Sequence, residues 1–140
     1  MVHNDGFRPL DRQACLWLLG KVPVGRVVYT EQALPAVLPV DFRLGSDCSV
    51  LVRTSAGSQL ARAADGAVVA FEADAFDMPG RSGWSVVVTG RAELVKEPAE
   101  QERLPLTVPV PWLPAAEGVF LRIAPDMVTG RELPGLRAHC

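Results

Sequence analysis

An arginine, three hydroxyl side chains and a glycine stand close together in residues 53–59 (RTSAGSQ). The apolar residues before this run predict a strand, and the alanine-rich residues after it predict a short helix. The N–H groups at a helix start and the forked donors of an arginine suit a phosphate group, and hydroxyls add further donors. The residues of this candidate phosphate cradle are Arg53, Thr54, Ser55 and Ser58, and Gln59 follows them. A second interpretation stays open, in which Ser58 is an ordinary N-cap beside a solvated arginine.

Two further stretches offer contacts for a flat ligand. Proline cannot donate to a strand ladder, so Pro39 predicts an edge strand, a bulge, or backbone lined up against a heterocycle. The residues of this stretch are Pro39, Val40, Asp41 and Phe42. Trp84 and Ser85 open the clearest strand in the chain, and an indole ring there can stack on a heterocycle or shield it from water. Both stretches have an alternative interpretation: Pro39 would only blunt a strand edge, and Trp84 would be a core or dimer-contact residue. Trp17, in the predicted first helix, is assigned to the core.

Several catalytic arrangements are missing from the sequence. The two histidines, His3 and His139, lie near the ends of the chain, where a general base is poorly held. The motifs of a nucleophile elbow, a P-loop and a dinucleotide-binding turn are also missing. We therefore expect any catalysis to come from a bound cofactor, with the protein supplying position and electrostatics.

Composition sets further limits on the class of protein. With 140 residues, 49% of them hydrophobic and 21% charged, the chain suits one globular domain. A net charge of −2 argues against a nucleic-acid partner, and no run approaches the ~18 apolar residues of a membrane span. The three cysteines show no CxxC spacing, which predicts free thiols in a reducing cytoplasm and no metal site.

Hydrophobic periodicity predicts a mostly β chain with short helices. The expected strands are residues 24–30, 36–44, 49–53, 67–73, 84–95, 118–123 and 126–133, with a loop at 74–83. The expected helices are residues 11–20, 58–64 and 97–103, and four prolines make residues 104–114 a crossing loop. Six or seven strands without an alternating βαβ order predict an antiparallel barrel, because closure removes exposed strand edges. We expect a flexible arm at residues 1–10, one domain at 11–133 and a tail at 134–140.

Four stretches, in this order and spacing, resemble the small split-barrel proteins of the pyridoxamine 5′-phosphate oxidase-like family, which includes nitroimidazole-reductase-like flavoproteins. They are residues 25–42, which end in Pro-Val-Asp-Phe, and residues 52–60, 83–92 and 128–131. The resemblance implies a homodimeric split β-barrel with FMN bound in a groove between the two subunits.

The resemblance also implies a role for each candidate residue. Arg53, Thr54, Ser55 and Ser58 would hold the FMN phosphate. Residues 39–42 would run along the flavin ring, Trp84 and Ser85 would approach it from another strand, and Trp112 would reach toward the partner's site. Many relatives carry a phosphate-binding lysine where this chain has Gln59. A neutral donor replaces a charged one, so we expect flavin binding to be about tenfold weaker.

Three functions are compatible with these observations. The first is an FMN-dependent oxidoreductase that reduces a small organic acceptor. The second is a deazaflavin-dependent reductase on the same fold. The third is a non-catalytic protein that binds a flavin or another small molecule, which the neutral Gln59 and the lack of a well-held acid–base residue favour.

Overall fold

The computed structural model of the protein describes residues 6–95 and 118–135. The expected helix at residues 97–103, the crossing loop at 104–114 and Trp112 lie outside the described residues. The elements are β1 (Arg8–Leu10), α1 (Arg12–Leu19), β2 (Val24–Glu31), β3 (Leu34–Leu44), β4 (Val50–Ser55), α2 (Gln59–Ala64), β5 (Val68–Asp77), β6 (Ser82–Leu94), β7 (Gly118–Ile123) and β8 (Met127–Pro134). Within this part of the chain, no helix is long and apolar enough to cross a membrane.

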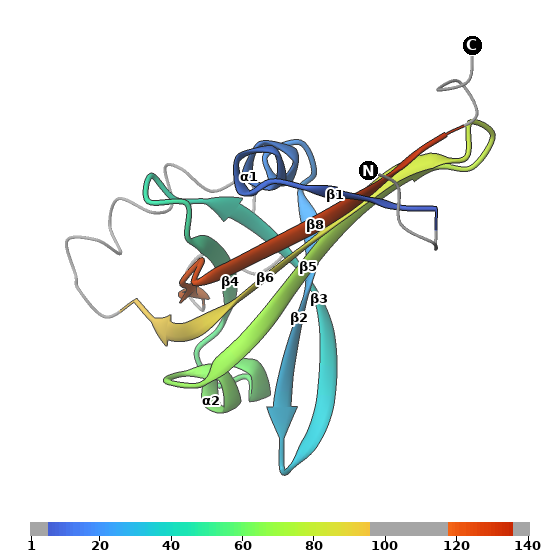
Figure 1. Ribbon diagram of the computed structural model, residues 1–140. Coiled ribbons are helices and arrows are strands. Elements are labelled where there is room, and N and C mark those ends of the chain that lie inside the picture. Colours follow the sequence, from blue (N-terminus) through green and yellow to red (C-terminus); the bar gives the residue numbers. More distant parts are fainter. Residues whose placement is uncertain (1–5, 96–117, 136–140) are drawn as a thin grey trace.

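Six antiparallel strands close into a barrel in the order β6, β5, β2, β3, β4 and β7. The barrel closes where residues 92–94 of β6 pair with residues 121–123 of β7. β8 pairs with residues 82–89 of β6 on the edge away from β5, and β1 pairs with β8. β5, β6 and β8 thus form a long ribbon that extends away from the barrel (Figure 1). The predicted mostly β antiparallel barrel is therefore confirmed, and two strands extend it.

Alternating strand residues fill the barrel. In β5, Val69, Phe71 and Ala73 are buried, whereas the residues between them are partly exposed, as a strand with one face in the core requires. The fully buried Phe71 ring packs edge-on against Phe42 of β3, with ring centroids 4.6 Å apart. β2 passes so close that a Cβ at Gly25 would lie 2.7 Å from Cε1 of the Phe71 ring and closer still to its Cζ. Phe71 is therefore a central packing residue of the barrel.

Both described helices begin at predicted caps. The Asp11 carboxylate accepts a hydrogen bond from the Ala14 N–H at 2.8 Å, and the Ser58 hydroxyl accepts one from the Ala61 N–H at 3.0 Å. The backbone N–H of Gly20 closes the end of α1. The boundaries of both helices thus follow from local sequence.

The assignment of Trp17 to the core is wrong. Its side chain is 64% exposed, and the Lys21 ammonium lies 3.9 Å from the centroid of its ring. The short helix α1 buries Cys15 and Leu19, which are four residues apart on one stripe. Trp17 is two residues from each, a rotation of about 200°, and so faces away from the barrel.

Two segments are more regular than the sequence predicts. β5 continues to Asp77 and β6 begins at Ser82, so the expected loop at residues 74–83 shrinks to a turn at 78–81. Asp74 lies within β5 opposite Ser85, and only Asp77 stands at the start of the turn. Arg8–Leu10, in the expected flexible arm, pairs with residues 130–132 of β8. That pairing joins segments more than 120 residues apart, which local pattern does not reveal.

Candidate functional site

The hydroxyls of Thr54 and Ser58 meet where β4 leads into α2. Their oxygen atoms lie 2.9 Å apart, and the Ser58 hydroxyl also accepts the N-cap hydrogen bond from Ala61. The Ser58 N–H donates to the Ser55 carbonyl at 3.0 Å, which fixes the turn between strand and helix. The N-cap interpretation of Ser58 is therefore confirmed. Gln59, the first residue of α2, is exposed.

Arg53 is buried, which contradicts its interpretation as a solvated arginine. Its side chain is 7% exposed, and its guanidinium carbon lies 5.5 Å from the centre of the Phe120 ring. The Nε atom is fully buried and has no hydrogen-bond partner. Within the described residues, no acceptor is bonded to this guanidinium. A buried cation whose donors are unmet is the feature expected of a site for an anion.

Asp41 of β3 lies beside this arginine. Phe42 pairs with Val52, so Asp41 and Arg53 are the next positions along the two strands and face the same side. Asp41 is 6% exposed, and its Oδ2 atom is buried without a hydrogen-bond partner. Burial raises the pKa of the Asp41 carboxyl above its ordinary value, although a backbone hydrogen bond and the charge of Arg53 act in the opposite direction. Asp41 thus places a carboxyl beside the guanidinium, and no hydrogen bond or ion pair joins the two side chains.

Strand alternation divides the expected cradle into two groups. Val50 and Val52 point into the barrel core, whereas Leu51 belongs to a second cluster with Val95 and Phe120. Arg53 and Ser55 share the face of Leu51, and Thr54 and Ser58 lie toward the other side. Sequence reasoning missed Gly118 and Phe120, which pair with Ser55 and Arg53. The apolar run at residues 118–123 carries no signal for this contact, because only the strand pairing creates it.

Pro39, Val40 and Asp41 lie along an open strand edge, as predicted, whereas Phe42 pairs with Val52 of β4. β3 pairs with β2 at residues 34–41, and it pairs with β4 only at residues 42–44. The side of residues 34–41 away from β2 therefore carries no strand within the described residues. Pro39 is exposed, while Val40 and Phe42 belong to the core. This open edge begins next to Asp41 and so borders the Arg53 side chain.

Trp84 and Ser85 lie far from Arg53 within one chain. Trp84 packs partly buried against the core and borders a groove of about 440 Å³, which Phe76 and Leu133 also line. Trp84 is eight residues along β6 from Ala92, where the barrel closes onto β7. At about 3.3 Å per strand residue, that separation is roughly 26 Å. One chain therefore does not bring Trp84 and Arg53 into a single site.

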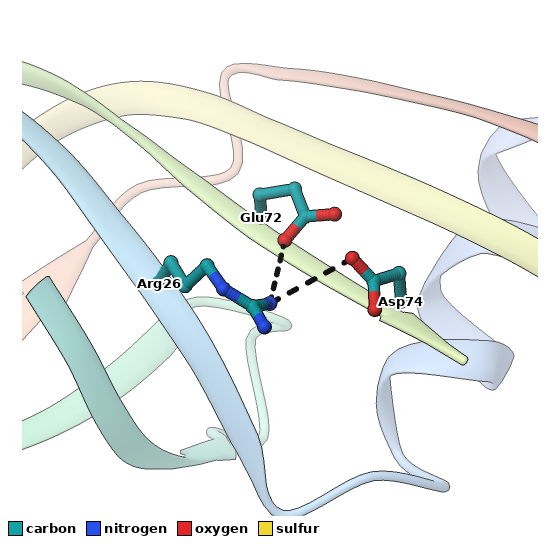
Figure 2. A network of polar contacts seen from close by, with 3 residues as sticks. All are labelled: Arg26, Glu72 and Asp74. Carbon is teal, nitrogen blue, oxygen red and sulfur yellow. Dashed lines mark hydrogen bonds and ion pairs between the residues drawn. The ribbon is translucent and has the colours of Figure 1, made fainter. Parts of the chain in front are cut away.

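A polar network lies on the outer face of the sheet (Figure 2). Arg26 Nη1 lies 3.1 Å from a Glu72 carboxylate oxygen and 3.7 Å from one of Asp74. Burial, a hydrogen bond with Asp74 and the negative charge of Asp74 raise the pKa of Glu72, Arg26 lowers it, and the net result is a pKa of about 7. The two carboxylates compete for one arginine, so Glu72 binds a proton near neutral pH.

The raised pKa of Glu72 predicts that stability falls as pH rises. An unfolded glutamate titrates near its usual pKa of about 4.3, so between there and pH 7 the folded protein binds more protons than the unfolded chain. Stability from this group is therefore complete at low pH and is lost as pH rises through about 7. Because the Glu72 side chain is 25% exposed and partly screened, we expect a loss of about 1–2 kcal/mol.

Urea unfolding between pH 5 and pH 8 measures this effect. Glu72→Gln should flatten the pH profile. Glu93→Gln, which removes an exposed carboxylate on the neighbouring strand β6, should leave the profile unchanged. A Glu72→Gln profile that keeps the full wild-type slope would contradict the role of Glu72.

Comparison with known proteins places the fold in a family. The barrel with its crossing strand order is a split β-barrel, and residues 11–132 match the family described as pyridoxamine 5′-phosphate oxidase. The chain belongs to this family. It is similar to the FAD binding protein from Mycobacterium smegmatis, with a TM-score of 0.77 and 33% identity over 89% of this chain and 98% of that one.

Two further proteins extend the comparison. An uncharacterised protein of Mycobacterium tuberculosis is 41% identical over 132 residues, which cover 86% of this chain and 82% of that protein. The FAD-binding protein from Mesorhizobium loti is 23% identical and shares the fold, with a TM-score of 0.73 over 90% of this chain and 97% of that one. The family resemblance inferred from the four sequence stretches is confirmed.

Proposed function

We propose that the chain binds a flavin nucleotide and that Arg53 contacts its phosphate group. The observation that carries this proposal is the burial of the Arg53 guanidinium with no acceptor bonded to it in the described part of the chain. A buried donor without a partner costs about 1–3 kcal/mol, and a phosphate oxygen would remove that cost. Ser55 lies on the same face as Arg53 and adds a hydroxyl. The similar protein from Mycobacterium smegmatis, an FAD binding protein, supports the same class of ligand.

Flavins with and without a phosphate test this proposal. Riboflavin carries the flavin ring and lacks the phosphate, so FMN or FAD should bind at least about tenfold more tightly in a fluorescence titration. Equal affinities for all three flavins would contradict the phosphate contact. If none of the three binds, the flavin proposal itself is wrong.

FMN is the form that the family resemblance implies, and FAD is a second candidate. A phosphate monoester such as that of FMN carries a charge of about −1.5 to −2 at pH 7. Each phosphate in the diphosphate of FAD carries a single negative charge. FAD therefore spreads a similar total charge over two phosphate groups. The site offers one buried cation, a neighbouring Asp41 and a neutral Gln59, which suits a single contact with a singly charged phosphate. Parallel titrations with FMN and FAD decide between them, and much tighter FMN binding would exclude the second candidate.

Gln59→Lys should tighten FMN binding by about tenfold. A charged donor contributes about 1.5–3 kcal/mol where a neutral one contributes about 1, and Gln59 is exposed at the start of α2, where a lysine keeps its hydration. Gln13→Lys adds the same charge at an exposed position on α1 and should leave the affinity unchanged. Unchanged FMN binding by Gln59→Lys would place the phosphate away from α2.

We further propose that the protein acts as a homodimer with the flavin between the subunits. Trp84 and Ser85 are separated from Arg53 by the length of β6, so a second copy must supply them if they contact the same flavin. The outer sheet face carries the 60%-exposed Val37 next to Val28, apolar surface that a second copy can cover. Sedimentation equilibrium should give twice the 15.1 kDa of one chain. A monomer at micromolar concentration, with flavin present, would contradict this arrangement.

We propose an oxidoreductase that reduces a small organic acceptor. A bound flavin supplies hydride transfer, and the chain would hold the flavin and exclude water from it. A deazaflavin in place of flavin would be recognised by its mass. Reduction by a nicotinamide donor, followed by several turnovers of an acceptor, tests the enzyme. Tight flavin binding without turnover by any donor and acceptor would instead support a non-catalytic binding protein.

A further inference from the structure

We infer that Gly118 is a positioning residue for the cofactor phosphate, acting through the guanidinium of Arg53. This inference rests on the proposed flavin-binding function. Gly118 is the first residue of β7 and pairs with Ser55, while Phe120 pairs with Arg53. Residues two apart on a strand share a face, so Gly118 and Phe120 lie on the face that carries Arg53 and Ser55.

The missing side chain at residue 118 leaves the space that the guanidinium occupies. A Cβ built on Gly118 would lie 2.6 Å from Nη2 and 2.7 Å from Cζ of Arg53, and closer still to Nε. These are the three nearest atoms to that position, and all are closer than 3.0 Å, a distance below which real Cβ atoms essentially never approach other atoms. Any side chain at residue 118 must therefore displace the guanidinium.

The backbone itself does not require glycine at this position. Gly118 lies outside the left-handed φ region, so alanine fits its backbone conformation. The atoms that obstruct a Cβ belong to the flexible end of one arginine and not to the backbone of a neighbouring strand. We therefore expect alanine at residue 118 to move Arg53 while the strand stays in place.

The space beside Gly118 also explains how the Arg53 guanidinium, which has no bonded acceptor, keeps one position. Gly118 borders the guanidinium directly, and the guanidinium carbon lies 5.5 Å from the centre of the Phe120 ring, a distance suited to a cation–π contact. Leu51 and Val95 pack around Phe120 and hold that ring. An arginine held in place before the ligand arrives loses less side-chain entropy on binding, which strengthens each contact with a phosphate.

The test measures the affinities of wild type, Gly118→Ala, Arg53→Ala and the double variant for FMN, FAD and riboflavin. Gly118→Ala should bind the better phosphorylated flavin about tenfold or more weakly, with unchanged riboflavin affinity and an unchanged thermal unfolding midpoint. Because the glycine acts through the arginine, the double variant should bind as weakly as Arg53→Ala and no weaker. Gly20→Ala, at a helix end where a Cβ meets nothing closer than 3.5 Å, is the control and should match wild type.

The possible results separate the two claims. Wild-type affinity in Gly118→Ala, or losses that add in the double variant, would overturn the positioning role while leaving flavin binding intact. An equal loss of riboflavin affinity would show general damage to the site and would also overturn it. If the wild-type protein binds none of the three flavins, the proposed function fails, and the role of Gly118 fails with it.

Discussion

Arg53→Ala should weaken binding of FMN or FAD by about tenfold or more while the protein stays folded. A charge-assisted hydrogen bond contributes about 1.5–3 kcal/mol, and about 1.4 kcal/mol corresponds to tenfold in affinity. Arg53 makes no hydrogen bond to the described residues, so its removal breaks none of the bonds that hold the barrel together. Its loss also removes an unmet buried donor, which offsets the lost packing against Phe120. Flavin fluorescence titration and thermal unfolding measure the two effects separately.

Arg62→Ala is the matched control for this prediction. Arg62 lies on α2 close to the same turn, is exposed, and donates from its side chain to the Gly57 carbonyl. Its removal takes away one positive charge near the site without changing the space that the Arg53 guanidinium occupies. Arg62→Ala should therefore lose much less affinity for FMN or FAD than Arg53→Ala loses. Equal losses in the two variants would mean that overall charge, and not the buried guanidinium, governs binding.

Phe71→Ala should lower the free energy of unfolding by about 3–5 kcal/mol, the largest effect that we expect on stability. The Phe71 ring is fully buried, contacts Phe42 and closes the gap above Gly25. β5 pairs with both β2 and β6, so the cavity would open between three strands that cannot collapse toward one another without breaking their ladders. Urea unfolding monitored by tryptophan fluorescence gives this difference directly.

Phe76→Ala provides the comparison on the same strand. Phe76 is 49% exposed on the part of β5 that extends beyond the barrel, so its removal should cost well under half as much. A similar loss for the two substitutions would mean that the barrel centre is not the main source of stability. The comparison of the two variants separates the effect of removing any aromatic residue from that of removing one in the packed core.

Local sequence patterns predicted much of this fold. Asp11 and Ser58 cap their helices as expected, and the barrel strands lie close to the predicted runs because alternation and β-branched residues report a half-buried surface. The strand order predicted a closed antiparallel barrel, and the family resemblance specified a split barrel, which the structural comparison confirms. Two predictions that failed concern the buried face of a helix and a pairing decided by a distant partner. Trp17 is exposed because α1 buries one narrow stripe, and Arg8–Leu10 is a strand because β8 is available to pair with it.

The candidate site shows the same division. The sequence singled out Arg53, Thr54 and Ser58, and the two hydroxyls do meet. It did not predict that Arg53 is buried, since that depends on Phe120 and Gly118 reaching it from β7. It also did not separate Trp84 from Arg53, because linear order does not tell which end of a long strand lies beside which neighbour. The contacts assigned to the flavin by resemblance remain predictions.

The absorbance spectrum and mass of any cofactor released from the freshly purified protein test flavin binding most directly, with the spectrum repeated after FMN and then FAD are added. We expect a yellow protein, or one that becomes yellow with added flavin nucleotide, and a released mass equal to that of FMN or FAD. A colourless protein whose spectrum and stability do not respond to either nucleotide would contradict the proposal, and would leave the barrel and its buried arginine in need of a different anionic ligand.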